Sequence, residues 1–137
     1  MRTKYGFLME PIGHVRARSR YRYDAPRQGV LAGATGDRIV LAPGRNFEQA
    51  LLGLDGFERI WILWAFHLNK GWKPVAHPPR APAAGVGVFA SRAPYRPNPL
   101  GLSAVRLVSV SGRELVIAES DLLDGTPILD IKPYVPY

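Results

Sequence analysis

The chain has 137 residues, among them 18 Lys and Arg, 11 Asp and Glu, and no cysteine. That length fits one domain, and the lack of cysteine excludes disulfides, thiolate catalysis and cysteine-held zinc. Hydrophobic residues make up 47% of the chain, which excludes intrinsic disorder. The 14 glycines and 13 prolines favour short strands and turns over long helices.

The net charge of +7 is unevenly distributed along the chain. Residues 1–27 hold seven basic and two acidic side chains (+5), and residues 28–70 hold four of each (0). Residues 71–106 hold five basic and no acidic side chains (+5), and residues 107–137 hold two basic and five acidic ones (−3). No carboxylate side chain occurs between Glu58 and Glu114. Such a charge distribution indicates a polyanionic partner, and nucleic acid is the first candidate. The alternative is that the charge only keeps an ordinary enzyme in solution.

Membrane and export signals are weak. The apolar stretch from Ile60 to Phe66 is too short to span a bilayer, and the basic N-terminus is not followed by an apolar run of signal-peptide length. The expectation is a soluble cytoplasmic protein with no membrane partner.

The first third of the chain predicts two strands and one short helix. The first strand covers residues 8–15, interrupted by Pro11 and Gly13, and a second covers 38–42. Between them lie a turn at 24–29 and four alternating arginines that share one side of an extended chain: Arg16, Arg18, Arg20 and Arg22. Asn46 and Gln49 predict a capping box for a helix over 47–52.

The remainder predicts further strands. Residues 59–66 indicate a strand buried on both faces, or a core strand that leads into an interface. Residues 67–84 predict a long loop rich in proline, and 86–91 another strand. Residues 102–110 and 114–119 predict a hairpin, and 127–134 a last strand. Because no βαβ alternation occurs, we expect an all-β fold with one or two short helices, in which antiparallel strands close into a barrel.

Several kinds of site are not indicated. The chain has neither a GxGxxG segment opening a helix nor a P-loop. His14, His67 and His77 lack metal-ligand spacing, so no metal site is predicted.

Residues 89–103 predict a rigid polar loop. Three prolines fix the backbone here and would hold Arg92, Arg96 and Asn98 in set directions. Arginine suits carboxylates and phosphates, and asparagine offers a donor and an acceptor to a base edge. The alternative is a plain corner between two strands.

Residues 120–134 predict an acidic turn region in an otherwise basic chain. Asp121, Asp124 and Asp130 lie within ten residues of one another. These carboxylates could receive a ligand's ammonium or sulfonium charge, or accept a proton. The alternative is that the Asp-Gly-Thr-Pro segment at 124–127 only forms a turn.

Four segments together resemble the TsaA-like (YaeB-like) family: Pro-Arg-Gln at 26–28, Gly-Phe-Glu-Arg-Ile-Trp-Ile-Leu-Trp-Ala-Phe-His at 56–67, Arg-Pro-Asn-Pro-Leu-Gly-Leu-Ser at 96–103, and Asp-Gly-Thr-Pro-Ile-Leu-Asp-Ile-Lys-Pro-Tyr at 124–134. Members are S-adenosylmethionine-dependent tRNA methyltransferases acting on the exocyclic N6 of threonylcarbamoyladenosine beside the anticodon. The resemblance implies an antiparallel β-barrel rather than a Rossmann-like methyltransferase. It also implies a homodimer with the donor near the subunit interface.

The resemblance also implies site residues. The S-adenosylmethionine contacts would be Pro26, Arg27, Gln28, His67, Leu68, Arg92, Leu102, Leu123, Asp124, Gly125 and Thr126. Substrate would be held by Arg96, Asn98, Lys132 and Tyr134. Asp124, Asp121 and His67 are the candidates for accepting the proton of the methylated nitrogen. Leu102, Leu123 and Phe66 would give the sulfonium an apolar wall, and Tyr21, Tyr23 and Tyr95 could stack an extruded anticodon-loop base.

Many bacterial family members continue past the Lys-Pro-Tyr segment into a small C-terminal domain. For residues 1–137 we expect a single catalytic barrel domain without that companion. Two other functions stay open on the residues alone: a non-catalytic RNA-binding β-barrel, and a small-molecule hydrolase using Asp121 or Asp124 with His67.

Overall fold

The computed structural model describes residues 6–18, 36–66, 71–80 and 82–136. Its strands are β1 (Gly13–Arg16), β2 (Asp37–Leu41), β3 (Arg59–Ala65), β4 (Val75–Ala76), β5 (Val86–Gly87), β6 (Leu100–Ser111), β7 (Glu114–Ala118) and β8 (Pro127–Pro133). The helical segments are α2 (Phe47–Ala50) and two 3-10 turns, η1 (Leu54–Gly56) and η2 (Val88–Ala90).

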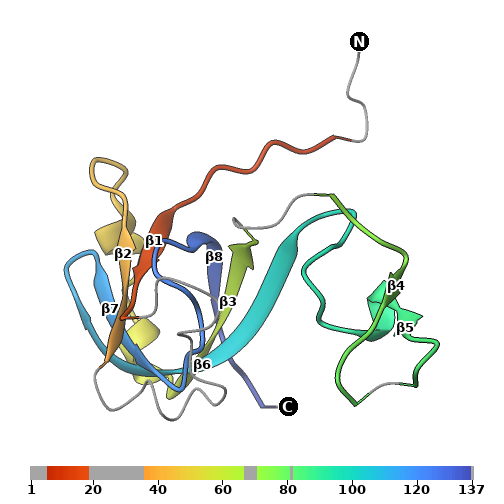
Figure 1. Ribbon diagram of the computed structural model, residues 1–137. Helices are drawn as coiled ribbons and strands as arrows, with labels where there is room; N and C mark the ends of the chain where they lie inside the picture. The colour runs from red at the N-terminus through yellow and green to blue at the C-terminus, as the bar shows by residue number, and fades with distance from the viewer. Residues whose placement is uncertain (1–5, 19–35, 67–70, 81, 137) are drawn as a thin grey trace.

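Six of these strands form a closed barrel in the order β1-β2-β7-β6-β3-β8, and every pairing is antiparallel (Figure 1). The barrel closes where β1 pairs with β8, Gly13 opposite Ile128 and His14 opposite Pro127. Closure leaves no open edge among these six strands. The predicted antiparallel barrel is confirmed.

The barrel interior is filled by branched aliphatic side chains, which stand mostly at every second strand position between half-buried or exposed ones. Val15, Ile39, Ile60, Leu115 and Ile128 are fully buried. Each such side chain contributes about 1.5–3 kcal/mol through its removal from water. The period of two, typical of strands with one buried face, therefore accounts for the barrel core.

The predicted hairpin is present, with β6 beginning at Leu100 and Ser111 pairing with Glu114. Its turn uses Gly112 in the left-handed conformation, φ 59°. The register between β6 and β7 shifts between Leu107 and Ser109, which marks a bulge.

Several local predictions need correction, and three of them concern the first strand and the helix. The first strand begins only at Gly13, after Pro11, which has no N–H for a ladder. Asn46 stands at the N-cap position but its side chain makes no capping hydrogen bond; its backbone is left-handed, φ 59°, and its side chain instead donates to Gln49 Oε1 at 2.7 Å. The helix itself ends at Ala50.

Two more corrections concern later strands. Strand β3 is fully buried on one face only, because Ile60 and Ile62 point into the barrel while Trp61 and Leu63 are half-buried. The strand expected over 86–91 stops at Gly87 and turns into η2, where the Ser91 hydroxyl donates to the Val88 carbonyl at 2.9 Å.

A small two-stranded sheet of β4 and β5 projects beside the barrel (Figure 1). We call residues 71–80 and 82–90 the flap. Part of the loop expected over 67–84 thus has regular structure, because Val75 pairs with Gly87 and Ala76 with Val86. Within the described ranges, no helix is long and apolar enough to cross a membrane.

Candidate functional site

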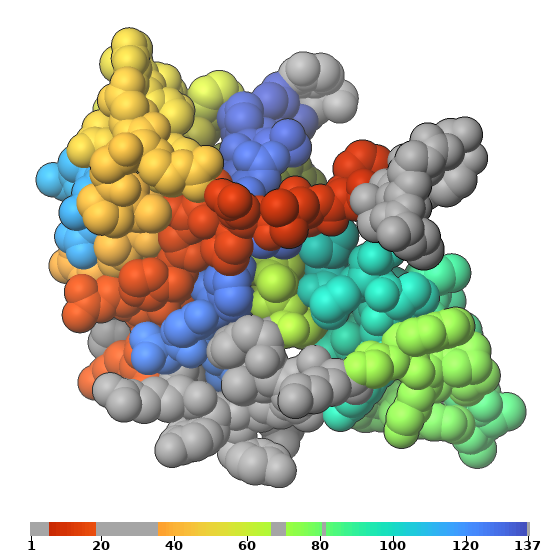
Figure 2. Space-filling view, turned by 90° about the horizontal axis from the view of Figure 1, so that it is seen from above, coloured from red at the N-terminus to blue at the C-terminus, as the bar shows by residue number. Residues whose placement is uncertain are grey.

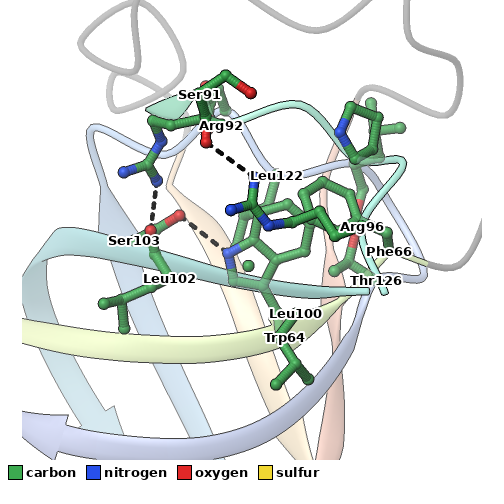
Figure 3. A pocket seen from close by; sticks show the side chains of 14 residues that line it. Trp64, Phe66, Ser91, Arg92, Arg96, Leu100, Leu102, Ser103, Leu122 and Thr126 are labelled. Atoms are coloured by element: carbon green, nitrogen blue, oxygen red, sulfur yellow. Dashed lines mark hydrogen bonds between the residues drawn. The ribbon is translucent and has the colours of Figure 1, made fainter. Parts of the chain in front are cut away.

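A cavity of about 490 Å³, here called the main cavity, lies at the end of the barrel where β3 finishes and β6 begins (Figure 3). It is bordered by the loop before β6 and by the segment before β8. Its lining comprises Trp64, Phe66, Ser91, Arg92, Pro94, Arg96, Leu100, Gly101, Leu102, Ser103, Asp121, Leu122, Leu123 and Thr126.

The aromatic floor of the main cavity comes from the end of β3. The Trp64 and Phe66 rings meet edge to face, with centroids 4.4 Å apart. Trp64 Nε1 donates to Ser103 Oγ at 2.9 Å, and the Phe66 N–H donates to the Pro99 carbonyl at 2.9 Å. The first bond fixes the Trp64 ring against β6, and the second fixes the backbone at Phe66 against the residue before β6.

Two arginines stand over this floor, and backbone carbonyls hold both (Figure 3). Arg92 donates to the Leu102 carbonyl. Arg96 donates from Nη1 to the carbonyls of Ser91 at 2.8 Å and Ala93 at 3.2 Å. A guanidinium has five N–H donors, so each arginine keeps donors for a ligand while its direction is fixed.

The opposite wall is the segment before β8. Asp121 is exposed at the cavity, and Leu122 behind it is buried. The buried Thr126 hydroxyl donates to the Leu123 carbonyl at 2.7 Å and so closes the turn. The Gly125 N–H donates to the Val15 carbonyl at 2.8 Å, which docks the turn on β1.

Asp124 lines a second cavity of about 450 Å³ rather than the main one, together with Arg16, Arg18 and Asp37. Its Oδ1 accepts the N–H of Ala17 at 2.9 Å. Asp37 is buried, and that burial raises the pKa of its carboxyl; nearby Arg18 lowers this pKa and the Asp124 charge raises it. Arg38 and Glu114 also line this cavity, so three carboxyl groups and three arginines meet where β1 ends and β2 begins.

The structure brings together six of the residues predicted from the sequence to form the site. The main cavity contains Arg92, Arg96, Leu102, Asp121, Leu123 and Thr126. Phe66, expected in the apolar wall, is also there.

Other predicted site residues lie elsewhere. Asp124, Gly125 and Asn98 do not line the main cavity. Lys132 forms an ion pair with Asp130 at 2.9 Å, and the Tyr134 ring packs on Trp61, with centroids 5.1 Å apart. The following predicted residues lie outside the described ranges: Pro26, Arg27, Gln28, His67 and Leu68, with Arg20, Arg22, Tyr21 and Tyr23.

The sequence did not single out Trp64, Ser91, Leu100 or Ser103 as cavity residues. One signal was available, because a glycine inside a strand marks a close approach. Gly101 is such a glycine, and it pairs with Trp64 across β3 and β6. Among the described residues, no three His, Asp or Glu side chains are grouped so as to hold a metal ion.

Residues 14–137 match the family model described as the tRNA-methyltransferase O N-terminal domain. The chain belongs to this family. Its expected relationship to tRNA methyltransferases is therefore confirmed, and the barrel and main cavity described above are those of a family member.

Individual relatives agree with the family match. The chain is 41% identical over 139 residues to the tRNA (adenine(37)-N6)-methyltransferase of Escherichia coli K12, covering 96% of this chain and 59% of that protein. It is 40% identical over 126 residues to a Pyrococcus abyssi protein named "Probable S-adenosyl-L-methionine-binding protein", covering 92% of this chain and 67% of that one.

A crystal structure of TrmO from P. aeruginosa superposes with a TM-score of 0.80 at 38% identity. The match covers 99% of this chain and 59% of that one. The barrel is therefore the family's fold, and the chain spans about 59% of the length of the E. coli relative.

Proposed function

We propose that this chain forms the catalytic barrel of an S-adenosylmethionine-dependent tRNA methyltransferase that acts on N6 of threonylcarbamoyladenosine beside the anticodon. The observation that carries the proposal is the main cavity, where two fixed arginines, an apolar wall and a carboxylate converge. Family membership and the names of the relatives support the reaction class.

The main cavity has suitable chemistry for the donor. Its volume of about 490 Å³ lies within the usual range for small-molecule sites. Leu100, Leu102 and Leu123 offer the apolar surroundings that suit a dispersed sulfonium charge. Arg92 offers a guanidinium to the donor's carboxylate.

When bound, the donor supplies a methyl group on sulfur, which moves to the attacking nitrogen in a displacement that requires alignment of three atoms. The chain's contribution is to position both partners. Trp64 and Phe66 form an aromatic floor, and Arg96 is placed to pair with the threonyl carboxylate of the substrate.

The methylated nitrogen must lose a proton, and a carboxylate or a neutral histidine can take it. Asp121 lies in the main cavity, while Asp124 lies behind the turn, where its carboxylate accepts the Ala17 N–H. We therefore favour Asp121 as the proton acceptor. Asp121→Asn is expected to reduce the single-turnover methylation rate by about a hundredfold, with donor affinity retained, whereas Asp124→Asn is expected to act mainly on stability.

We further propose a homodimer that acts in the cytoplasm, where tRNA is found. Large apolar side chains of the flap and of the arm before β1 are exposed, namely Phe89, Trp72, Phe7 and Leu8. Large apolar side chains exposed to solvent are more frequent where a protein surface is covered by a partner. A monomer in sedimentation at micromolar concentration would contradict the dimer.

The test of the reaction is mass analysis of nucleosides from tRNA incubated with the chain and S-adenosylmethionine. The expected product carries one added methyl group on threonylcarbamoyladenosine. Calorimetry with the donor separates the alternatives: RNA binding without donor binding would instead support a non-catalytic RNA-binding barrel. Donor-independent turnover would support a hydrolase.

A further inference from the structure

A third cavity, here called the flap cavity, has a volume of about 470 Å³ and lies between the flap and the loop before β6. In Figure 2 the green flap stands beside the cyan atoms of that loop and β6, on the side of the molecule away from the yellow α2 region. The flap cavity and the main cavity share Arg92 and Pro94 as a common wall. The two cavities are therefore neighbours.

Backbone hydrogen bonds hold the flap cavity open in one shape. The Lys73 N–H donates to the Tyr95 carbonyl at 3.0 Å, and the Val88 N–H donates to the Pro74 carbonyl at 2.9 Å. Gly85, with φ 85°, packs against Ala76 so closely that a side chain there would overlap its carbonyl. A preformed cavity lowers the ordering cost of a ligand.

The lining combines an aromatic ring, proline faces and cations. Lys73 Nζ lies 5.5 Å from the centroid of the Tyr95 ring, and Arg92 stands at the shared wall. No Asp or Glu is among the described residues that line it. An aromatic ring with adjacent cations is how proteins bind single-stranded nucleic acid, since the ring stacks a base and the cations meet phosphate.

We propose that the flap cavity binds a nucleotide adjacent to the target in the RNA strand, with its base on Tyr95 and its phosphate near Lys73. This inference rests on the proposed function, because it takes the main cavity as the place of the target nucleoside. Bases in an RNA loop can be splayed out of the stack and read one by one. The shared wall at Arg92 then separates consecutive nucleotides of one strand.

The test measures binding of the full chain to an anticodon stem-loop RNA, without methyl transfer, by fluorescence anisotropy. The RNA is used complete and with an abasic site on either side of the target adenosine. Base stacking on an aromatic side chain is worth about 1–3 kcal/mol, so Tyr95→Ala is expected to weaken binding about tenfold. Tyr95→Phe, which keeps the ring, is expected to stay within about twofold of the parent chain.

The position of the nucleotide is read from the abasic RNAs. One of them is expected to bind the parent chain about tenfold more weakly than the complete RNA does. The same abasic RNA is expected to bind Tyr95→Ala as tightly as the complete RNA binds Tyr95→Ala, because the abasic site and the substitution remove the same contact. Lys73→Gln is expected to weaken all the RNAs and to flatten the salt dependence. Arg45→Gln is the matched charge control, since Arg45 precedes α2 and pairs with Glu10 at 3.7 Å, away from the flap.

Unchanged RNA affinity in Tyr95→Ala would overturn the proposal. It would also be overturned if each abasic site weakened binding to Tyr95→Ala as much as it weakens binding to the parent chain. Absence of any stem-loop binding by the parent chain would overturn it too. Failure of the proposed methyl transfer is recognised separately, because it appears as unmodified tRNA in the nucleoside analysis while RNA binding and its dependence on Tyr95 persist.

Discussion

The indole ring of Trp64 covers the backbone of Gly101, and a Cβ atom at position 101 would overlap three ring atoms. The two residues are direct partners between β3 and β6. Gly101→Ala must therefore displace Trp64 from Ser103 and from the floor of the main cavity. We expect the free energy of unfolding to fall by about 1–3 kcal/mol, the usual cost of overpacking, and donor affinity to fall with it.

Gly56→Ala is the matched control for Gly101→Ala. A Cβ atom at Gly56 meets nothing within 4 Å, so the stability of Gly56→Ala is expected to stay close to that of the parent chain. Denaturant unfolding of both variants measures the difference. Equal stability of Gly101→Ala and Gly56→Ala would show that Trp64 is free to move aside.

Arg92→Ala is expected to weaken donor binding about tenfold or more, since hydrogen bonds to charged groups contribute about 1.5–3 kcal/mol. Arg92 lines the main cavity and is oriented by the Leu102 carbonyl. Titration calorimetry with S-adenosylmethionine measures the change.

The control for Arg92→Ala is Arg113→Ala. Arg113 also donates to a backbone carbonyl, that of Leu41 at 2.6 Å, but it does not line the main cavity. Its loss is expected to leave donor affinity unchanged. Equal donor affinity in Arg92→Ala and the parent chain would contradict the assignment of Arg92 to the donor.

Asp37→Asn is expected to stabilise the chain at neutral pH. Burial raises the pKa of Asp37 above its ordinary value of 3.8, so the folded chain holds this proton more tightly than the unfolded chain. The stabilising contribution is fully present below pH 3.8 and is lost as the pH rises through the raised pKa. The amide cannot ionise, so it removes this loss.

Thermal unfolding between pH 4 and pH 8 tests Asp37→Asn. The gain in Tm over the parent chain is expected to be largest near neutral pH and to shrink towards acid. Asp55→Asn, at an exposed carboxylate in η1, serves as the control. A difference in Tm between Asp37→Asn and the parent chain that does not vary with pH would contradict this explanation.

Arg16→Ala and Arg18→Ala are expected to weaken tRNA binding while donor affinity is retained. Both side chains are exposed and line the second cavity. If each meets one phosphate, each substitution lowers the slope of log affinity against log salt concentration by about one. Filter binding at several salt concentrations gives the slope; an unchanged slope in both variants would remove these arginines from the RNA surface.

The strands of the barrel were predictable because their signal is local. Buried residues alternate along β1, β2, β6 and β7, and Gly112 marks the hairpin turn. The predicted capping box at Asn46 does not form, and the residue types alone could not have revealed this. Asn46 takes a left-handed conformation, and this turns its amide towards Gln49 instead of the helix N–H groups.

The cavity was predictable only where the sequence carries recognisable segments. Arg92, Arg96 and Asp121 lie in such segments and do line the main cavity. Trp64 and Ser103 were missed because their contact joins residues 39 positions apart and depends on the register of β3 and β6. Asp124 and Asp121 are alike in the sequence, and only the docking of the turn on β1 separates the directions they face.

The short pairing of β1 with β8 has a dynamic consequence. Two residue pairs join these strands, and one of them contains Pro127, which has no N–H to donate. We therefore expect local unfolding to begin at this seam and to free the turn that the Gly125 N–H docks on Val15. A ligand that binds only the closed barrel makes the open form rarer. Hydrogen exchange at the Gly125 amide, which does not line the main cavity, would therefore become slower when that cavity is occupied.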